Sequence, residues 1–149
     1  MRGKGFTLIE LLIVVAILAI LAAISIPNLL SAQRRSRYSR AASDTKTATS
    51  QSIVYQNDRN RYPGTIAALR VDGYANVTDN DPWKNPYVTS NLFMDSSPTP
   101  TAGDEIHVCS QGVTGAAGDC TPADLAATPP SILNGGVGYS ATYGAWMGS

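Results

Sequence analysis

The chain has 149 residues, a formal net charge of zero and one histidine. A neutral chain creates no long-range field that would attract nucleic acid, and the sequence has no dinucleotide-binding, phosphate-binding or zinc-binding spacing. No nucleophile and base can be assembled around His107, so an enzymatic function is not predicted. The length suits one small domain with an appendage.

The first thirty residues contain a short basic leader followed by a long apolar stretch over 6–30, in which Glu10 is the only charge. A bilayer core needs about 20 apolar residues as a helix, and only a helix satisfies the backbone of a single segment in lipid. A cleaved secretory signal would be shorter and would end in a small-residue cleavage site. We therefore predict a retained transmembrane helix over 6–30.

The sequence from Gly5 to Glu10, Gly-Phe-Thr-Leu-Ile-Glu, resembles the processing site of the type IV pilin superfamily, which includes the pseudopilins of type II secretion. In that family a dedicated prepilin peptidase cuts after the glycine and methylates the new amino terminus. The resemblance implies that residues 1–5 are the leader and that Phe6 is the first mature residue. It also implies that Glu10 guides subunits into the filament.

Two roles for Glu10 stay open. A charge within a membrane helix is costly and usually marks function. In an apolar filament core, Glu10 of one copy can neutralise the new ammonium on Phe6 of a neighbour. Thr7 and Glu10 also fit the capping-box pattern, in which the glutamate reaches back to the start of its own helix. The two roles can coexist at different stages.

Pro27 predicts a kink or local unwinding near the end of the apolar run, with Ser25 helping to satisfy the freed carbonyls. From 31 to 57 the pattern stays helical but becomes amphipathic, because small and apolar residues recur every three or four positions. These residues are Tyr38, Ala41, Ala42, Thr45, Ala48, Thr49, Ser52 and Ile53. Together the two halves would form a helix about 75 Å long, which a soluble domain of this size cannot bury.

Charge and cysteines disagree about the membrane topology. Four arginines directly follow the apolar run: Arg34, Arg35, Arg37 and Arg40. The positive-inside rule would place them in the cytoplasm, whereas Cys109 and Cys120 predict a disulfide in an oxidising compartment. Because the family resemblance implies a cytoplasmic amino terminus, we expect a single pass through the bacterial inner membrane with that orientation. The arginines would then contact either anionic headgroups or acidic residues of adjacent subunits.

Residues 58–149 are expected to form a globular head. Asparagine, proline and glycine residues end the long helix, and Thr65 is expected to cap a short second helix. Strands are predicted near Tyr87, near Ile106 and over 139–146. A small antiparallel sheet on the amphipathic half-helix makes the predicted fold class α+β and pilin-like.

Residues 81–87, Asp-Pro-Trp-Lys-Asn-Pro-Tyr, resemble the Asp-Pro-Trp-Gly-Asn-Pro-Tyr signature of the major pseudopilin of type II secretion. Lys84 replaces the glycine that this family usually has. The two prolines stiffen the loop, and we expect Trp83 to hold it on the long helix.

Major pseudopilins bind calcium through acidic residues after the following strand, and calcium needs six to eight oxygen ligands. This chain has Thr114, Gly115 and Ala116 at the corresponding place, with only Asp119 and Asp124 nearby. No cofactor is therefore predicted, and calcium is the less favoured alternative.

The cysteine pair resembles the disulfide-closed loop of type IV pilins. The favoured hypothesis is a structural subunit of a type IV pilus filament, because the acidic calcium ligands of the major pseudopilin are missing at the corresponding place. The alternatives are the major pseudopilin of a type II secretion system and a single-pass anchored binding module, which would keep its leader and stay unassembled. Expected partners are further copies in a helical filament, prepilin peptidase, the inner-membrane assembly platform and membrane lipids. The filament would lie at the cell surface or span the periplasm.

Overall fold

The structure is a computed structural model that describes residues 5–90, 106–113, 115, 136–142 and 144–147. The chain divides into two compact units, Met1–Ser36 and Arg37–Ser149, and each is described by itself.

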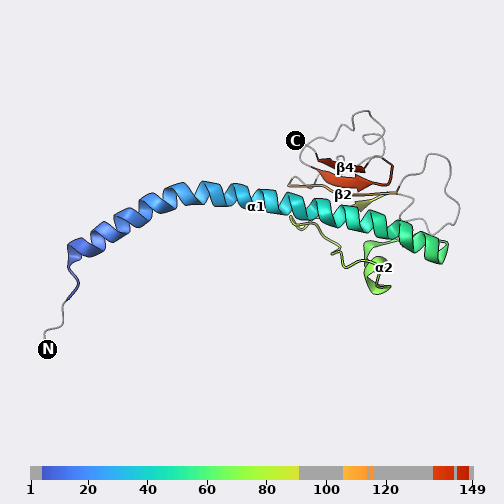
Figure 1. Cartoon of the computed structure of the whole chain (residues 1–149), viewed down its shortest axis with the longest axis horizontal. Coiled ribbons are helices and arrows are strands. Elements are labelled where there is room, and N and C mark those ends of the chain that lie inside the picture. Colours follow the sequence, from blue (N-terminus) through green and yellow to red (C-terminus); the bar gives the residue numbers. More distant parts are fainter. Residues whose placement is uncertain (1–4, 91–105, 114, 116–135, 143, 148–149) are drawn as a thin grey trace. The chain divides into compact units, whose positions relative to one another are not determined.

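Two helices and four strands make up the described secondary structure (Figure 1). They are α1 (Leu8–Arg59), α2 (Ile66–Val71), β1 (Val88–Thr89), β2 (His107–Ser110), β3 (Val137–Ser140) and β4 (Gly144–Met147). A long amino-terminal apolar helix together with an antiparallel sheet confirms the predicted α+β, pilin-like fold class.

Helix α1 continues through Pro27 without a break. Proline lacks the N–H that would bond to the carbonyl of Ala23, four residues earlier. The Ser25 hydroxyl donates instead to the carbonyl of Leu21 at 2.8 Å, so the expectation that Ser25 satisfies the freed carbonyl is wrong. The reason is the usual reach of a helical serine, which bonds four residues back from itself. The alternative of local unwinding at Pro27 is wrong, because the helix is continuous on both sides of it. The kink stays a prediction.

In the second unit, α1 buries one stripe of mostly small side chains: Ala41, Thr45, Ala48, Thr49, Ser52 and Tyr55. Their three- and four-residue spacing confirms the predicted amphipathic pattern. Small side chains let the backbone of a strand come close, and the Thr49 hydroxyl donates to the carbonyl of Tyr139 on β3 at 3.1 Å. The stripe therefore joins the helix to the sheet directly.

The sheet is antiparallel and four-stranded in the order β1-β2-β3-β4. The predicted strand over 139–146 is wrong in one respect, since the chain turns back within it and forms the hairpin of β3 and β4. The turn is supported by the Thr142 N–H, which donates to the Ser140 hydroxyl at 3.1 Å. Gly144, with a φ of +79°, begins the return strand in a backbone conformation that favours glycine. Alternating residue types on both sides of the turn conceal it in the sequence.

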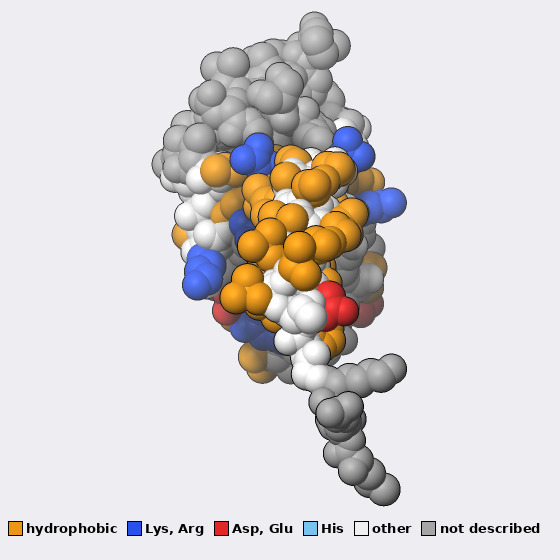
Figure 2. Space-filling model, turned by 90° about the vertical axis from the view of Figure 1, so that its left-hand side faces the viewer, with side chains coloured by type: hydrophobic (Ala, Val, Ile, Leu, Met, Phe, Trp, Pro, Cys, Tyr) orange, Lys and Arg blue, Asp and Glu red, His pale blue; other side chains and the backbone are white. Residues whose placement is uncertain are grey.

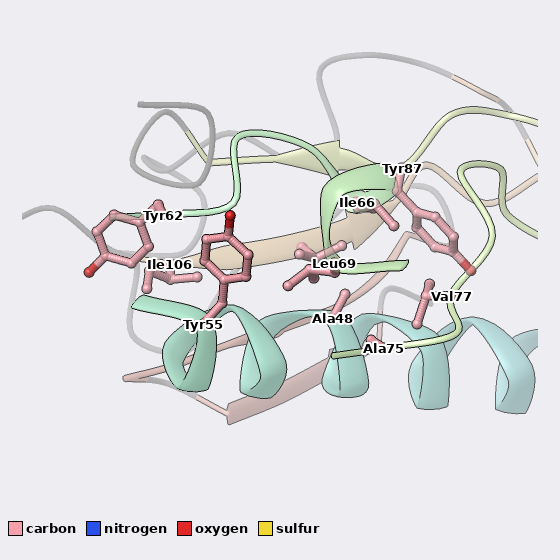
Figure 3. Packing of buried hydrophobic residues seen from close by; sticks show 10 residues of the cluster. Ala48, Tyr55, Tyr62, Ile66, Leu69, Ala75, Val77, Tyr87 and Ile106 are labelled. Carbon is pink, nitrogen blue, oxygen red and sulfur yellow. The ribbon is translucent and has the colours of Figure 1, made fainter. Parts of the chain in front are cut away.

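Among the described residues, a cluster of buried side chains joins α1, the segment before α2, α2 itself, the loop after it and β2 (Figure 3). Figure 3 shows Ala48 and Tyr55 of α1 directed toward Ile66 and Leu69 of α2. The whole cluster is Ala48, Tyr55, Tyr62, Ile66, Leu69, Ala75, Val77, Tyr87, Ile106 and Val108. As predicted, Thr65 caps α2, because its side chain accepts from the Ala68 N–H at 3.1 Å.

Tyr87 connects this core to the polar edge of α1. Its hydroxyl donates to Asp44 Oδ2 at 3.1 Å. Burial, followed by the negative charge of Asp44, raises the pKa of Tyr87 well above its ordinary value. Tyr87 therefore keeps its proton and remains a donor at any physiological pH.

Candidate assembly site

The amino-terminal end of α1 is closed by reciprocal contacts between Thr7 and Glu10. The backbone N–H and the hydroxyl of Thr7 both donate to Glu10 Oε2, at 2.9 and 2.6 Å. The N–H of Glu10 in turn donates to the Thr7 hydroxyl oxygen at 3.3 Å. These contacts are those of a capping box, so the predicted local role of Glu10 is confirmed.

The capping contacts occupy only one oxygen of the Glu10 carboxylate. Glu10 is exposed, and no residue within the described ranges donates a hydrogen bond to its Oε1. A carboxylate has about four acceptor positions on its two oxygens. Glu10 can therefore cap its own helix and still accept from a cation that another copy supplies.

Gly5 and Phe6 precede the helix in an exposed, non-helical segment, and Phe6 is 79% exposed. A Cβ added at Gly5 would meet no atom within 4 Å. The fold of the chain itself therefore does not require glycine at this position. Residues 1–4 of the predicted leader lie outside the described residues.

In the part of the chain that the structure describes, α1 is the one helix long and apolar enough to cross a membrane. None of its most apolar 18-residue window is buried inside the molecule, which distinguishes it from the core helix of a soluble protein. The large apolar side chains between Leu8, which is 81% exposed, and Leu30, which is 54% exposed, all stay exposed. Figure 2 views the molecule from the side of its amino-terminal end and shows hydrophobic side chains in orange gathered there. So much exposed apolar surface requires lipid or other protein chains around it.

The four arginines after the apolar run differ in their contacts. Arg34, Arg35 and Arg37 are exposed. Arg40 lies near Asp44, with 3.6 Å between Nε and Oδ2. Arg40 is exposed and Asp44 only partly buried, so water screens the pair and it contributes little to stability.

The loop over 81–87 is organised by Asp81, which is 5% exposed. Its Oδ1 accepts from the N–H groups of Trp83 and Asn85 at 2.9 and 2.8 Å, and its Oδ2 accepts from the Ser110 hydroxyl at 2.7 Å. The Trp83 ring packs edge-on against Tyr38 of α1, with ring centroids 4.8 Å apart. The expectation that Trp83 holds this loop on the long helix is confirmed.

Lys84 has a φ of +73°, which is left-handed backbone that favours glycine. We expect Lys84→Gly to raise the free energy of unfolding by about 0.5–1 kcal/mol, because the cost of a Cβ in this conformation exceeds the extra chain entropy of glycine. Urea denaturation of the detergent-solubilised chain measures the change. Lys84→Ala keeps the Cβ and serves as the control, with unchanged stability expected. A glycine variant less stable than the alanine variant would contradict the explanation.

The strand predicted near Ile106 is confirmed as β2. His107 and Cys109 lie buried on it, and so do Val108 and Ser110, so both faces of the strand are covered and the alternation does not mark an exposed face. Cys120 lies outside the described residues, and no free cysteine occurs among those that the structure describes. The disulfide between Cys109 and Cys120 stays a prediction.

Of the residues weighed for calcium, only Gly115 is described; Thr114, Ala116, Asp119 and Asp124 lie outside the described residues. Within the described ranges, no three or more His, Cys, Asp and Glu residues lie together where they could hold a metal ion. Calcium binding is therefore untested.

Asn85 makes a contact that the sequence did not predict. Its side-chain amide donates to the carbonyl of Gly112 at 2.9 Å. A Cβ at Gly115 would lie 3.1 Å from Asn85 Oδ1, so the close approach favours glycine there. Two features of the sequence could have indicated this contact: the glycines at 112 and 115, and the position of Asn85 between the two prolines that stiffen the loop.

Helix α1 begins with a capped apolar half, and the Gly5–Phe6 bond before it is exposed. Its second half packs on an antiparallel sheet. These features define a pilin-like, membrane-anchoring chain. Residues 1–26 match the family model described as the prokaryotic N-terminal methylation motif. The chain is 32% identical over 133 residues to the type II secretion system core protein G of Aeromonas hydrophila, with 78% of this chain and 87% of that protein covered. The chain belongs to the superfamily of type IV pilins and type II secretion pseudopilins.

Two pilus proteins are similar over shorter stretches. The type IV wide pilus major component of Thermus thermophilus is 52% identical over 68 residues, which cover 46% of this chain and 52% of that protein. The type IV major pilin protein of Myxococcus xanthus is 48% identical over 61 residues, which cover 41% of this chain and 28% of that protein. Both branches of the superfamily are thus represented among its relatives.

Proposed function

We propose that the chain is cut between Gly5 and Phe6 and then polymerises through α1 as the structural subunit of a type IV pilus. The observation that carries this proposal is the capping box, which holds the only acidic residue of the apolar run at the helix start with one oxygen available. Cleavage creates an ammonium on Phe6 at the same end of the helix. Pairing of the two charges between neighbouring copies would set their axial register.

In this proposal the chain has no catalytic role and no cofactor. It inserts in the bacterial inner membrane with its amino terminus in the cytoplasm, where prepilin peptidase and the assembly platform act on it. The apolar half of α1 then exchanges lipid for the same half of other copies, which keeps its apolar surface out of water.

Processing is tested by mass spectrometry of the chain made in cells that contain prepilin peptidase. The expected product lacks residues 1–5 and carries a methyl group on the Phe6 amine. Gly5→Leu should keep its leader, because the peptidase and not the fold requires a small residue there. Gly3→Leu places the same side chain two residues earlier and should still be cut. An intact leader on the unaltered chain would instead support an anchored binding module.

The major pseudopilin of a type II secretion system is the second candidate. The loop over 81–87 and the similarity to a core protein G over 78% of this chain favour it. Deleting the gene separates the two candidates. Loss of filaments that shearing releases from the cell surface supports the pilus, whereas periplasmic accumulation of secreted enzymes supports the pseudopilus.

A further inference from the structure

The start of α1 decides which peptide bonds before it stay outside the helix. Thr7 is the N-cap, because its carbonyl accepts the first helical hydrogen bond, from the Leu11 N–H at 3.4 Å. Gly5 and Phe6 come directly before it and are exposed and non-helical. The Gly5–Phe6 bond therefore lies just outside the helix, where a small shift of the helix start would include it.

The Thr7 hydroxyl binds the N–H that would otherwise extend the helix toward the amino terminus. Its oxygen accepts from the Glu10 N–H at 3.3 Å. In an α-helix the same N–H would donate to the carbonyl of Phe6, four residues earlier. One step further, the Ile9 N–H would donate to the carbonyl of Gly5. The cap and a longer helix thus compete for the same donor.

A second set of contacts opposes the same extension. The Thr7 N–H donates to Glu10 Oε2 at 2.9 Å, and the Thr7 hydroxyl donates to the same oxygen at 2.6 Å. In a longer helix the Thr7 N–H would have to leave this carboxylate for a backbone carbonyl. Side chains that can accept from the first turn are strongly preferred at an N-cap over valine, which cannot. Threonine at this position therefore favours a helix that begins at Leu8.

Hydrolysis of the Gly5–Phe6 bond needs the Gly5 carbonyl to be accessible. In the cut, water adds to the Gly5 carbonyl carbon and the bond to the Phe6 nitrogen breaks. The products are a carboxylate on Gly5 and an ammonium on Phe6. A helical carbonyl is hydrogen-bonded and enclosed by its own turn, whereas exposed irregular segments are the preferred sites of proteolysis. A helical form of this bond would have to open before it could be cut.

We propose that Thr7 is a positioning residue for the peptidase, because its capping hydroxyl keeps the Gly5–Phe6 bond outside the helix. This inference rests on the cleavage proposed above and assigns a residue that helps to bring it about. Thr7 acts before assembly, whereas the charge of Glu10 acts during assembly. A slower cut delays the mature subunit without lowering its final amount, so filament yield at completion stays unchanged.

The test is cleavage of the full chain in detergent micelles by purified prepilin peptidase, with initial rates fitted to kcat and KM. Thr7→Val keeps the branched shape and loses the hydroxyl. Where part of the chains are helical through the bond, the peptidase binds only the remainder, so KM should rise about two- to fivefold with kcat unchanged. Nuclear magnetic resonance of the chain alone, labelled at Gly5 and Phe6, should show their carbon shifts moving toward helical values.

Thr7→Ser and Thr7→Asn should restore the KM of the unaltered chain, since both side chains can cap a helix. Asparagine has no hydroxyl, so its rescue separates capping from direct recognition of a hydroxyl by the peptidase. Thr47→Val is the matched control. It removes another hydroxyl of α1, which donates to the Ser43 carbonyl at 2.8 Å and takes no part in the cap, and should leave KM and kcat unchanged.

Three outcomes would overturn the positioning role. They are an unchanged KM in Thr7→Val, a rise that serine corrects and asparagine does not, and a rise without any helical shift at Gly5 and Phe6. Each of them leaves the proposed function intact as long as the unaltered chain is cut between Gly5 and Phe6. An unaltered chain that the peptidase leaves whole refutes the proposed function itself.

Discussion

Glu10→Gln is expected to abolish filaments while the chain remains inserted in the membrane and correctly processed. Glutamine can replace glutamate in a capping box, so the local contacts with Thr7 persist. It cannot neutralise the ammonium of Phe6 on a neighbouring copy. An unpaired charge in an apolar core is strongly unfavourable, so each subunit contact should weaken on the order of 100-fold or more. Sheared filaments quantified by immunoblot and microscopy measure the effect, and Glu10→Ala should behave alike.

Thr7→Val is the matched control because it removes the capping hydroxyl and keeps the charge of Glu10. Its filament yield should stay close to that of the unaltered chain. Two outcomes would reject charge pairing in favour of capping alone. One is a normal filament yield from the glutamine variant, and the other is a loss of filaments in the valine variant alone.

Asp81→Ala is expected to produce the largest loss of stability in the head. Its carboxylate accepts from two backbone N–H groups and from the Ser110 hydroxyl, and its removal leaves these donors without their acceptor. The Ser110 donor is buried and the two N–H groups are part-buried. An unsatisfied buried donor costs about 1–3 kcal/mol and a part-buried one costs less, so the free energy of unfolding should fall by about 3 kcal/mol. The melting temperature of the detergent-solubilised chain should drop on the order of 10 °C, measured by circular dichroism.

Asp79→Ala is the control, since Asp79 is a nearby aspartate whose contact with Arg70 is exposed. Water screens that ion pair, and we expect little change in melting temperature. Similar losses in both variants would show that Asp81 has no special part in the loop. Asp81→Ala should also weaken the contact of Trp83 with Tyr38, because the position of the Trp83 ring depends on the loop conformation that Asp81 holds.

Local patterns in the sequence were sufficient for the elements whose causes are local. The apolar run, the Thr7 and Glu10 cap and the stripe from Ala41 to Ser52 depend on helical spacing, and the structure confirms them. The division of 139–146 into two strands was not predicted, because the turn interrupts a pattern that alternates on both sides. The sequence also did not reveal what Asp81 and Asn85 bind, since their partners Ser110 and Gly112 lie more than twenty positions away.

The order of residues alone is enough to specify an apolar, capped helix with an acid at its start and a processing-type glycine before it. These features depend on hydrophobicity and on contacts within a few residues, which the order of residues specifies directly. The burial of Asp81 among its three donors and the contact of Tyr38 with Trp83 became visible only in the folded chain. Such contacts join residues far apart in the chain, and packing of the head on α1 brings them together.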